Sequence, residues 1–397
     1  MPLNFRDTSI AFKAQSTRSL QRSKWIFFIL SKSSLVRIGK GLIMAAFRLR
    51  IPINYLILKT VFKQFCGGQT VSDSKNVISK NWKYHVASIL DYSVEGQIDK
   101  LGFDQTQKSI IETIDLAKNN SGVPLAVFKV TGLVKASLLQ KVSSGMNLTK
   151  DDLASWEKGL ERIDEILAHA YSLDVPIMID AEESWIQNAV DDIARKGMEL
   201  YNKKDVIVYN TIQCYKIGQL SLLKKNIDQS IKADYLYGVK LVRGAYMEKE
   251  NSRSKKLGYK SPIQPSKYDT DKEFNECIKY VLKIIGSPAK KKGIGLIIGT
   301  HNEESTILAA NTLKNLGWEN NEAPVWFAQL YGMSDNISFN LANNGYKTAK
   351  YLPFGPIKEV IPYLFRRAEE NTSVEGQTGR ELSLINQELL RRQEKKI

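Results

Sequence analysis

Cysteine and histidine are scarce in this chain of 397 residues, which has three of each. The cysteines Cys66, Cys214 and Cys277 are far apart and odd in number, and no C-x-x-C pair or His/Cys cluster occurs. These absences argue against a disulfide framework and a zinc site, so we predict no metal and expect a reducing compartment. No Ser, Cys or His triad is visible either. Any chemistry must therefore use other side chains or a cofactor.

Acidic residues are almost absent from the first 70 positions, which hold twelve Lys or Arg against Asp7 alone. This stretch carries a net charge of +11, whereas the whole chain carries +15. We predict a basic α-helical N-terminal arm over 1–84. An anionic membrane surface and nucleic acid are both partners for such an arm. It lacks the aromatic-and-basic pattern of nucleic-acid modules, so no nucleic acid is expected.

Long hydrophobic runs are also missing from the arm. Its longest, "WIFFIL" (25–30) and "GLIMAAF" (41–47), are too short to span a bilayer. No small-residue cleavage site follows an apolar core, which disfavours a secretory signal, although an acid-poor basic arm also resembles an organelle transit peptide. We predict peripheral membrane contact through residues 1–70, with helices packed on the body as the alternative.

From about residue 85, eight runs rich in β-branched residues alternate with helix-length polar segments. Eight such units predict a (β/α)8 TIM-like barrel over 85–397. The alternative is an open doubly wound sheet, but no G-x-G-x-x-G opens any helix. The predicted strands are 88–96, 124–132, 176–183, 206–213, 238–246, 293–302, 324–332 and 347–355. The predicted helices are 105–119, 150–171, 184–199, 212–226, 271–285 and 303–316.

Polar side chains stand at the predicted C-terminal ends of nearly all these strands. A barrel interior needs mostly apolar residues, and barrel enzymes carry their active sites at this end, so a functional mouth is predicted. The residues concerned are Asp91, Glu95, Lys129, Asp180, Asn210, Gln213, Lys240, Arg243, Thr300, His301, Gln329 and Tyr351.

Two predicted strands contain a lysine among apolar neighbours. Lys240 in "GVKLVRGAY" and Lys129 in "VFKVTG" would be costly to bury without an anion or a developing negative charge nearby. The structural alternative is that Lys240 pairs with a barrel carboxylate such as Asp180. Gly244 would let the backbone approach a ligand closely.

The segment "YLFRRAEEN" (363–371) belongs to a predicted helix that follows the eighth strand. One apolar stripe of this helix consists of Ile357, Val360, Ile361, Leu364 and Phe365. Arg367 lies three positions after Leu364, near the buried edge of the stripe, and Arg366 lies between the stripe and solvent. Arginine forks bind carboxylates bidentately. A plain solvated helix is the alternative, but a helix after the last strand could cap the barrel mouth.

The motifs together resemble the proline dehydrogenase family. They are "VFKVTG", "IDAEE", "NTIQCY", "KLVRGAY", "GTHN", "QLYGM", "YLPFG" and "YLFRRAEEN", which run in family order from about 85 to 375. Lys240 and Met247 stand where many bacterial members have Arg and Trp, so the eukaryotic-like branch is favoured. The resemblance implies a distorted (β/α)8 barrel with its last helix across the mouth. A monofunctional enzyme is expected, because no aldehyde dehydrogenase module follows.

By this resemblance the chain would be an FAD-dependent enzyme that oxidises L-proline to Δ1-pyrroline-5-carboxylate, the first step of proline catabolism to glutamate. Hydride would pass to flavin N5 and electrons on to a membrane quinone. The implied carboxylate ligands are Arg366, Arg367 and Lys129. The ring would pack on Tyr246, Leu330 and Tyr351, and the cations would be held by Asp91, Glu95, Asp180 and Glu370. The implied FAD contacts are Asn210, Gln213, Lys240, Arg243, Gly244, Ala245, Thr300, His301 and Asn302.

Two other functions stay open. A hydroxyproline dehydrogenase has the same fold, but Tyr351 would crowd the ring hydroxyl, and that branch carries a smaller residue there. A catalytically inactive barrel with a membrane- or nucleic-acid-binding arm is disfavoured by the intact set of site residues. The expected location is cytoplasmic and peripheral on the inner membrane, or the matrix side of the mitochondrial inner membrane in a eukaryote.

Overall fold

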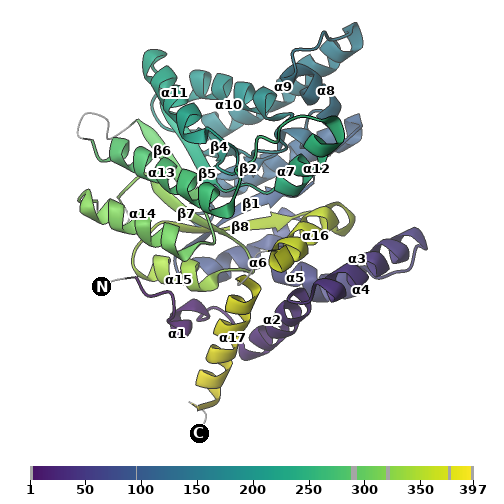
Figure 1. The fold of residues 1–397 in the computed structure, drawn as a ribbon, viewed down its shortest axis with the longest axis vertical. Coiled ribbons are helices and arrows are strands. Elements are labelled where there is room, and N and C mark those ends of the chain that lie inside the picture. The colour runs from purple at the N-terminus through teal and green to yellow at the C-terminus, as the bar shows by residue number, and fades with distance from the viewer. Residues whose placement is uncertain (1–2, 95, 288–292, 319–321, 374–376, 395–397) are drawn as a thin grey trace. The chain divides into compact units, whose positions relative to one another are not determined.

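Eight parallel strands follow one another around a closed barrel in sequence order (Figure 1). The computed structural model describes residues 3–94, 96–287, 293–318, 322–373 and 377–394. Each strand overlaps one predicted run, so the TIM-like fold class is confirmed. The strands are β1 Val86–Tyr92, β2 Ala126–Phe128, β3 Ile177–Ile179, β4 Val208–Gln213, β5 Tyr237–Val242, β6 Ile294–Gly299, β7 Val325–Leu330 and β8 Thr348–Phe354.

The chain divides into two compact units. The terminal unit comprises Met1–Ser93 and Gln329–Ile397, and the central unit comprises Val94–Ala328. Strands β1 and β8 belong to the terminal unit, where they pair in parallel from Val86 with Thr348 to Tyr92 with Phe354. Strands β2 to β6 belong to the central unit.

The described residues of the central unit form the six α-helices that the sequence predicts and two that it does not. The predicted helix 212–226 begins only at Gln219, because β4 continues to Gln213. Gly218 is the N-cap residue of this helix and has φ 79°. Capping side chains mark other starts, such as Thr149 and Asp152, which form a reciprocal capping box. The helices are α7 Lys100–Lys118, α8 Ala136–Ser143, α9 Lys150–Ser172, α10 Gln187–Tyr201, α11 Gln219–Lys232, α12 Met247–Leu257, α13 Lys267–Ile285 and α14 Glu303–Asn315.

The terminal unit is helical outside its strands, as predicted for the N-terminal residues. Its N-terminal helices are α1 Thr8–Ala11, α2 Thr17–Leu30, α3 Ser33–Arg48, α4 Asn54–Ile57, a π-helical turn Leu58–Phe62, α5 Lys63–Phe65 and α6 Val71–Trp82. Three helices follow β7 and β8, namely α15 Asp335–Asn343, α16 Ile357–Ser373 and α17 Gln377–Glu394.

One apolar cluster joins the N-terminal helices to α16 and α17. Phe27 of α2 and Phe65 of α5 meet edge to face with their ring centroids 6.2 Å apart. Val360 and Leu364 of α16 are buried in the same cluster. Burying each such side chain contributes roughly 1.5–3 kcal/mol. The predicted apolar stripe of α16 therefore packs against the N-terminal helices.

Candidate active site

Three charged side chains meet at the ends of β2, β3 and β5 in the central unit. Lys129 Nζ lies 3.5 Å from Asp180 Oδ2, and Lys240 Nζ donates to Asp180 Oδ1. Each of the three residues is less than a tenth exposed. The two oxygens of one carboxylate therefore hold two buried ammonium groups. The sequence predicted both lysines and the aspartate, and it also raised the pairing of Lys240 with Asp180.

The strand register places this lysine–aspartate cluster. Asp180 follows β3, and its backbone N–H donates to the carbonyl of Phe128 at the end of β2, at 2.9 Å. Lys240 lies in β5 beside Thr211 of β4. Because side chains alternate along a strand, Lys240 and Thr211 share one face of the sheet. Backbone hydrogen bonds thus align the positions from which the aspartate and lysine side chains extend, and the ion pair with Asp180 joins their ends.

A second buried carboxylate, Glu182, ties the loops around this cluster together. It accepts hydrogen bonds from the backbone N–H of Thr131, at 3.0 Å, and from its hydroxyl. The Gln213 side chain donates to the Glu182 carbonyl at 2.7 Å. The sequence predicted Gln213 but missed Thr131 and Glu182, although Glu182 stands in the quoted "IDAEE" motif. The available signal for Glu182 was a second acid within three residues of the end of a short apolar strand.

The guanidinium group of Arg243, just after β5, makes three hydrogen bonds and one contact with an aromatic ring. Its Nε donates to Asp271 Oδ1 at 2.6 Å and its Nη1 to Thr300 Oγ1 at 2.6 Å. Its Nη2 donates to Ser305 Oγ at 2.9 Å, and its Cζ lies 4.4 Å from the Phe274 ring centroid. This network brings Arg243 together with Thr300, which the sequence analysis gave as another cofactor contact. Asp271, Ser305 and Phe274 lie on helices, and nothing in the sequence of these helices indicated that the three residues contact Arg243.

The pKa of Asp271 reflects this network. Burial alone would raise it, but hydrogen bonds from Lys267 and Arg243 hold the pKa of this carboxyl below its usual value. Lys267 Nζ lies 2.6 Å from Asp271 Oδ2. The carboxylate therefore stays charged and fixes the guanidinium fork of Arg243.

Asn210 lies on the other face of β4. It is paired in register with Val239, one position before the pair of Thr211 with Lys240. Its side-chain amide donates to Asp191 Oδ1 on α10, at 2.9 Å. Burial raises the pKa of Asp191, while hydrogen bonds from Asn210 and Gln187 oppose that shift. The register does not bring Asn210 to the lysine–aspartate cluster, and its contact with a cofactor stays a prediction.

The remaining predicted residues of the central unit follow β5 and β6. Gly244 has φ 125°, which L side chains rarely adopt, and an added Cβ would lie 1.6 Å from Cδ1 of Tyr215. Only glycine fits this turn. Ala245 is exposed and Tyr246 is buried just before α12. His301 is half-buried, and Asn302 caps α14 by accepting from the Ser305 N–H at 2.9 Å.

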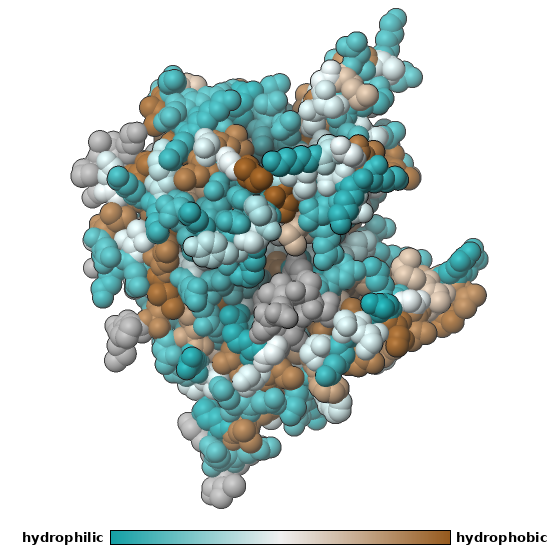
Figure 2. Space-filling model, viewed as in Figure 1, coloured by the Kyte–Doolittle hydropathy of each residue, from teal (hydrophilic) through white to brown (hydrophobic). Residues whose placement is uncertain are grey.

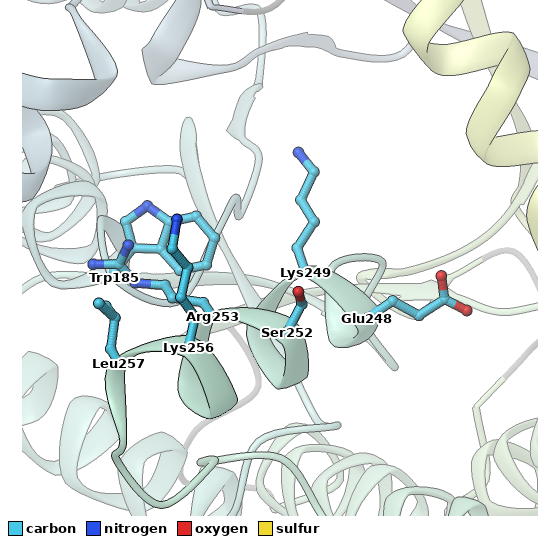
Figure 3. A pocket seen from close by; sticks show the side chains of 7 residues that line it. All are labelled: Trp185, Glu248, Lys249, Ser252, Arg253, Lys256 and Leu257. Carbon is cyan, nitrogen blue, oxygen red and sulfur yellow. The ribbon is translucent and has the colours of Figure 1, made fainter.

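A hollow of about 550 Å³ lies beside α12 (Figure 3). The Arg253 guanidinium stacks on Trp185, with Cζ 4.6 Å from the ring centroid. Lys249 Nζ lies 2.8 Å from Glu183 Oε1. The hollow is lined by Trp185, Glu248, Lys249, Ser252, Arg253, Lys256 and Leu257, none of which is a predicted site residue.

In the terminal unit, the predicted residues of β1, β7 and β8 are mostly buried. Asp91 is 1% exposed and accepts a hydrogen bond from the Ser93 hydroxyl. Burial and the nearby Asp91 charge raise the pKa of Cys66 well above its usual value. Tyr351 of β8 is buried, and its carbonyl accepts from the Tyr331 N–H at 2.9 Å, next to Leu330 at the end of β7.

The arginine pair lies in the middle of α16. Arg367 is 5% exposed, with its Cζ 5.2 Å from the ring centroid of Tyr363, and Arg366 is half-buried. The predicted difference in burial between the two arginines is therefore confirmed. Glu370 lies in the same helix, but its side chain is outside the described residues, as is Glu95.

Comparison with known proteins identifies the family. A sequence model of the family described as proline dehydrogenase matches residues 74–380. The chain belongs to the proline dehydrogenase family. This confirms the predicted resemblance.

Relatives with curated descriptions match most of the chain. Mitochondrial proline dehydrogenase 1 of Dictyostelium discoideum is 32% identical over 86% of this chain and 66% of its own length. Hydroxyproline dehydrogenase of Xenopus laevis is 30% identical over 98% of this chain and 90% of its own length. Mitochondrial proline dehydrogenase 1 of Homo sapiens is 35% identical over 62% of this chain and 40% of its own length. These matches are consistent with the eukaryotic-like branch.

A solved structure supports the fold. Proline utilization A from Bdellovibrio bacteriovorus, inactivated by N-propargylglycine, superposes with a TM-score of 0.70 at 19% identity. The match covers 92% of this chain and 38% of that protein. The chain thus spans less than half of that structural relative.

Within the described residues, no helix has both the length and the apolar character needed to cross a bilayer.

Proposed function

We propose that this chain oxidises L-proline to Δ1-pyrroline-5-carboxylate with FAD as its cofactor, the first step of proline catabolism to glutamate. The lysine–aspartate cluster of Lys129, Asp180 and Lys240 is the observation that carries this proposal. Buried charges are expensive, and a barrel with no ligand to bind would be more stable with apolar residues there. Charged groups at the C-terminal ends of barrel strands are instead typical of catalysis.

The donors present in the central unit fit a flavin. Lys240, Arg243 and the Gln213 amide are N–H donors in or after β4 and β5, and the ring carbonyls and nitrogens of a flavin would accept hydrogen bonds from such groups. Bound FAD would accept the hydride and pass electrons on to a membrane quinone. Lys240 would place positive charge where the ring gains electrons. Thr300, His301 and Asn302 would contact the same cofactor from the end of β6, together with Gly244, Ala245 and Asn210.

The substrate carboxylate would be bound by Arg366 and Arg367 with Lys129. Guanidinium forks match carboxylate geometry, and burial strengthens each charge-assisted hydrogen bond. The pyrrolidine ring would pack on Tyr246, Leu330 and Tyr351, which fix its orientation and exclude water. Asp91, Glu95, Asp180 and Glu370 would hold the cations in place.

The cellular setting is part of the same proposal. We assign residues 1–84 to a basic helical arm and 85–397 to the catalytic barrel. Residues 1–70 would contact a membrane peripherally, on the face where a quinone acceptor is available. That membrane would be the mitochondrial inner membrane, on its matrix side, if the chain is eukaryotic, and otherwise the cytoplasmic face of an inner membrane.

The first experiment is to purify the chain, record its flavin spectrum, and add L-proline without oxygen. Bleaching of the flavin by L-proline, and only weakly by trans-4-hydroxy-L-proline, is the expected result. A protein that binds no flavin, even after reconstitution with FAD, would refute the proposal and leave an inactive barrel.

Hydroxyproline oxidation is a second candidate, because the Xenopus hydroxyproline dehydrogenase aligns with 98% of this chain. The buried Tyr351 favours proline, since its ring would crowd a hydroxyl on the substrate. Faster bleaching by hydroxyproline than by proline would decide for the second candidate.

A further inference from the structure

Helix α3 presents an apolar stripe to solvent. Leu35, Ile38, Leu42 and Leu49 are 41%, 58%, 65% and 70% exposed. With Ala45 they recur every three or four residues, which places them on one side of the helix. Ile51, Tyr55 and Leu56 extend the exposed set beyond the helix end, and hydrophobic atoms gather over α3 and α4 in Figure 2.

The stripe is not needed for packing α3 onto the terminal unit. A separate row does that, in which Ala46 is buried and Val36, Ile43 and Phe47 pack partly buried against the apolar cluster with α16. Since successive residues lie about 100° apart on a helix, the exposed row lies beside this packed row. The apolar face of α3 is therefore about twice as wide as its core contact requires. Contiguous exposed apolar surface of this kind marks an interaction site.

The charge around the stripe indicates what covers it. Residues 8–72 contain no acid and eleven Lys or Arg. Arg37 and Arg48 lie on α3 and are exposed, and Lys32 and Arg50 flank it. An anionic surface complements this charge, and each basic side chain near such a surface strengthens binding. A second copy of the chain would bring two such acid-free surfaces together and would be repelled.

We propose that the exposed stripe of α3, with residues 49–56, docks on an anionic phospholipid bilayer. The helix lies in the plane of the membrane, with Ile38, Leu42 and Leu49 in the headgroup and acyl boundary. Its 16 residues are too few to span the bilayer, whereas an apolar side with basic flanks is typical of an interfacial helix. This inference rests on the proposed function, which assigns membrane contact to residues 1–70. It adds the helix face that makes the contact.

The test uses the full chain in a flotation assay with phosphatidylcholine vesicles, with and without phosphatidylglycerol. The wild type is expected to float with the anionic vesicles and to be released by high salt. The double variant Ile38→Ser/Leu42→Ser should bind at least about tenfold more weakly, because two apolar side chains no longer enter the lipid. The matched control is Leu101→Ser/Leu200→Ser in the central unit, at positions 82% and 63% exposed, and it should bind like the wild type.

Two results would overturn the inference. One is equal binding of the wild type and the α3 variant to anionic vesicles. The other is a dimer in solution that the α3 variant dissolves, which would assign the stripe to a second copy. Anaerobic bleaching by L-proline in vesicle-free buffer separates this inference from the proposed function. A stripe variant that bleaches normally shows that the enzyme is intact, whatever its lipid binding.

Discussion

The two units hold their charged site residues in different ways. In the central unit, Lys129, Asp180 and Lys240 stand in or directly after strands whose register fixes them, and Asp180 links both lysines. In the terminal unit, Arg366 and Arg367 stand on α16, whose other side packs on the apolar cluster with the N-terminal helices. The first arrangement is set by backbone pairing and the second by side-chain packing.

This difference separates two tasks in the proposed reaction. A cofactor remains bound through many turnovers and benefits from rigid, preorganised partners. A substrate must enter and leave, and a helix held by packing permits such exchange more readily than a paired strand. We therefore expect substitutions at Asp180 and Lys240 to affect flavin binding and folding, and those at Arg366 and Arg367 to affect the KM for proline.

The largest effect is expected for Asp180→Asn. Removing the shared carboxylate charge leaves two buried ammonium groups with a weaker partner, at a cost of about 3–5 kcal/mol in the free energy of unfolding. Urea unfolding and the fraction of bound flavin would measure it. Asp205→Asn, an exposed aspartate of the same unit, is the control and should change neither quantity. Normal stability and flavin content in Asp180→Asn would contradict the preorganised cluster.

The next largest effect is expected for Arg367→Met. Losing a charge-assisted contact to the substrate carboxylate costs roughly 1.5–3 kcal/mol, which raises the KM for proline about 10- to 100-fold while the flavin stays bound. Steady-state kinetics with a flavin spectrum would test this. Arg195→Met on α10 removes an arginine of the central unit and serves as the control. Loss of flavin from Arg367→Met would show that the two units do not divide the tasks in this way.

Two carboxylates should give opposite pH dependences of stability. The pKa of Asp271 in the central unit is lower in the folded than in the unfolded protein. Its contribution to the free energy of unfolding is therefore present above the unfolded pKa of about 3.9, and it is lost as the pH falls through the folded pKa. Burial raises the pKa of Glu381 in the terminal unit. Its contribution to the free energy of unfolding is therefore present below the unfolded pKa of about 4.3, and it is lost as the pH rises through the folded pKa.

These signs can be measured by urea unfolding between pH 3.5 and 7, a range set by the ordinary carboxyl pKa values of roughly 4. Asp271→Asn should be less stable than the wild type at pH 7, by about 1 kcal/mol, and the gap should close on acidification. The free energy of unfolding of Glu381→Gln should increase relative to that of the wild type as the pH rises. Parallel curves for both variants would contradict the assignment.

The smallest effect is expected for Lys40→Gln. Lys40 Nζ lies 2.6 Å from Glu369 Oε1 of α16 and 5.2 Å from the Phe365 ring centroid, but both charged side chains are 46% exposed. Such a pair contributes about 0.2–1 kcal/mol, so loosening α16 should raise the KM for proline no more than about fivefold. Lys32→Gln, at the start of α3, removes the same charge away from this pair and is the control. Equal KM values in both variants would show that α16 does not depend on this contact.

The barrel could be predicted because its strands lie in apolar runs that alternate with helix-length polar segments. The helix α12 could not, since its sequence "MEKENSRSKKL" has almost no apolar period. Its start is instead fixed after the turn at Gly244, where close approach to Tyr215 excludes a side chain. Local pattern therefore predicts the elements that pack by an apolar face, and it misses those placed by a tertiary contact.

The sequence indicates a candidate site residue where a residue type is rare in its context, such as a lysine within an apolar strand. It does not indicate one where a structural role explains the same pattern equally well. Lys350 lies inside β8 much as Lys240 lies inside β5, but it is 1% exposed and pairs with Asp335 at 2.8 Å. It also donates to the Met333 carbonyl. Nothing in the two strand patterns distinguishes these lysines. Both lysines pair with an aspartate, and only the fold shows that Asp180 is shared with a second lysine, Lys129, whereas Lys350 also donates to the backbone. The contact of Asn210 with Asp191 likewise comes from the fold and not from the strand pattern.

The acid-free N-terminal stretch has a consequence for how its surface responds to the environment. Residues 8–72 contain no Asp, Glu or His, the side chains that ordinarily change charge between about pH 3 and 7, and burial raises the pKa of their one cysteine, Cys66, well above its usual value. The charge of this surface is therefore constant across the physiological range. Acidity cannot switch its attraction to an anionic partner. Ionic strength can, because at 0.15 M salt the field of each exposed charge decays over about 8 Å.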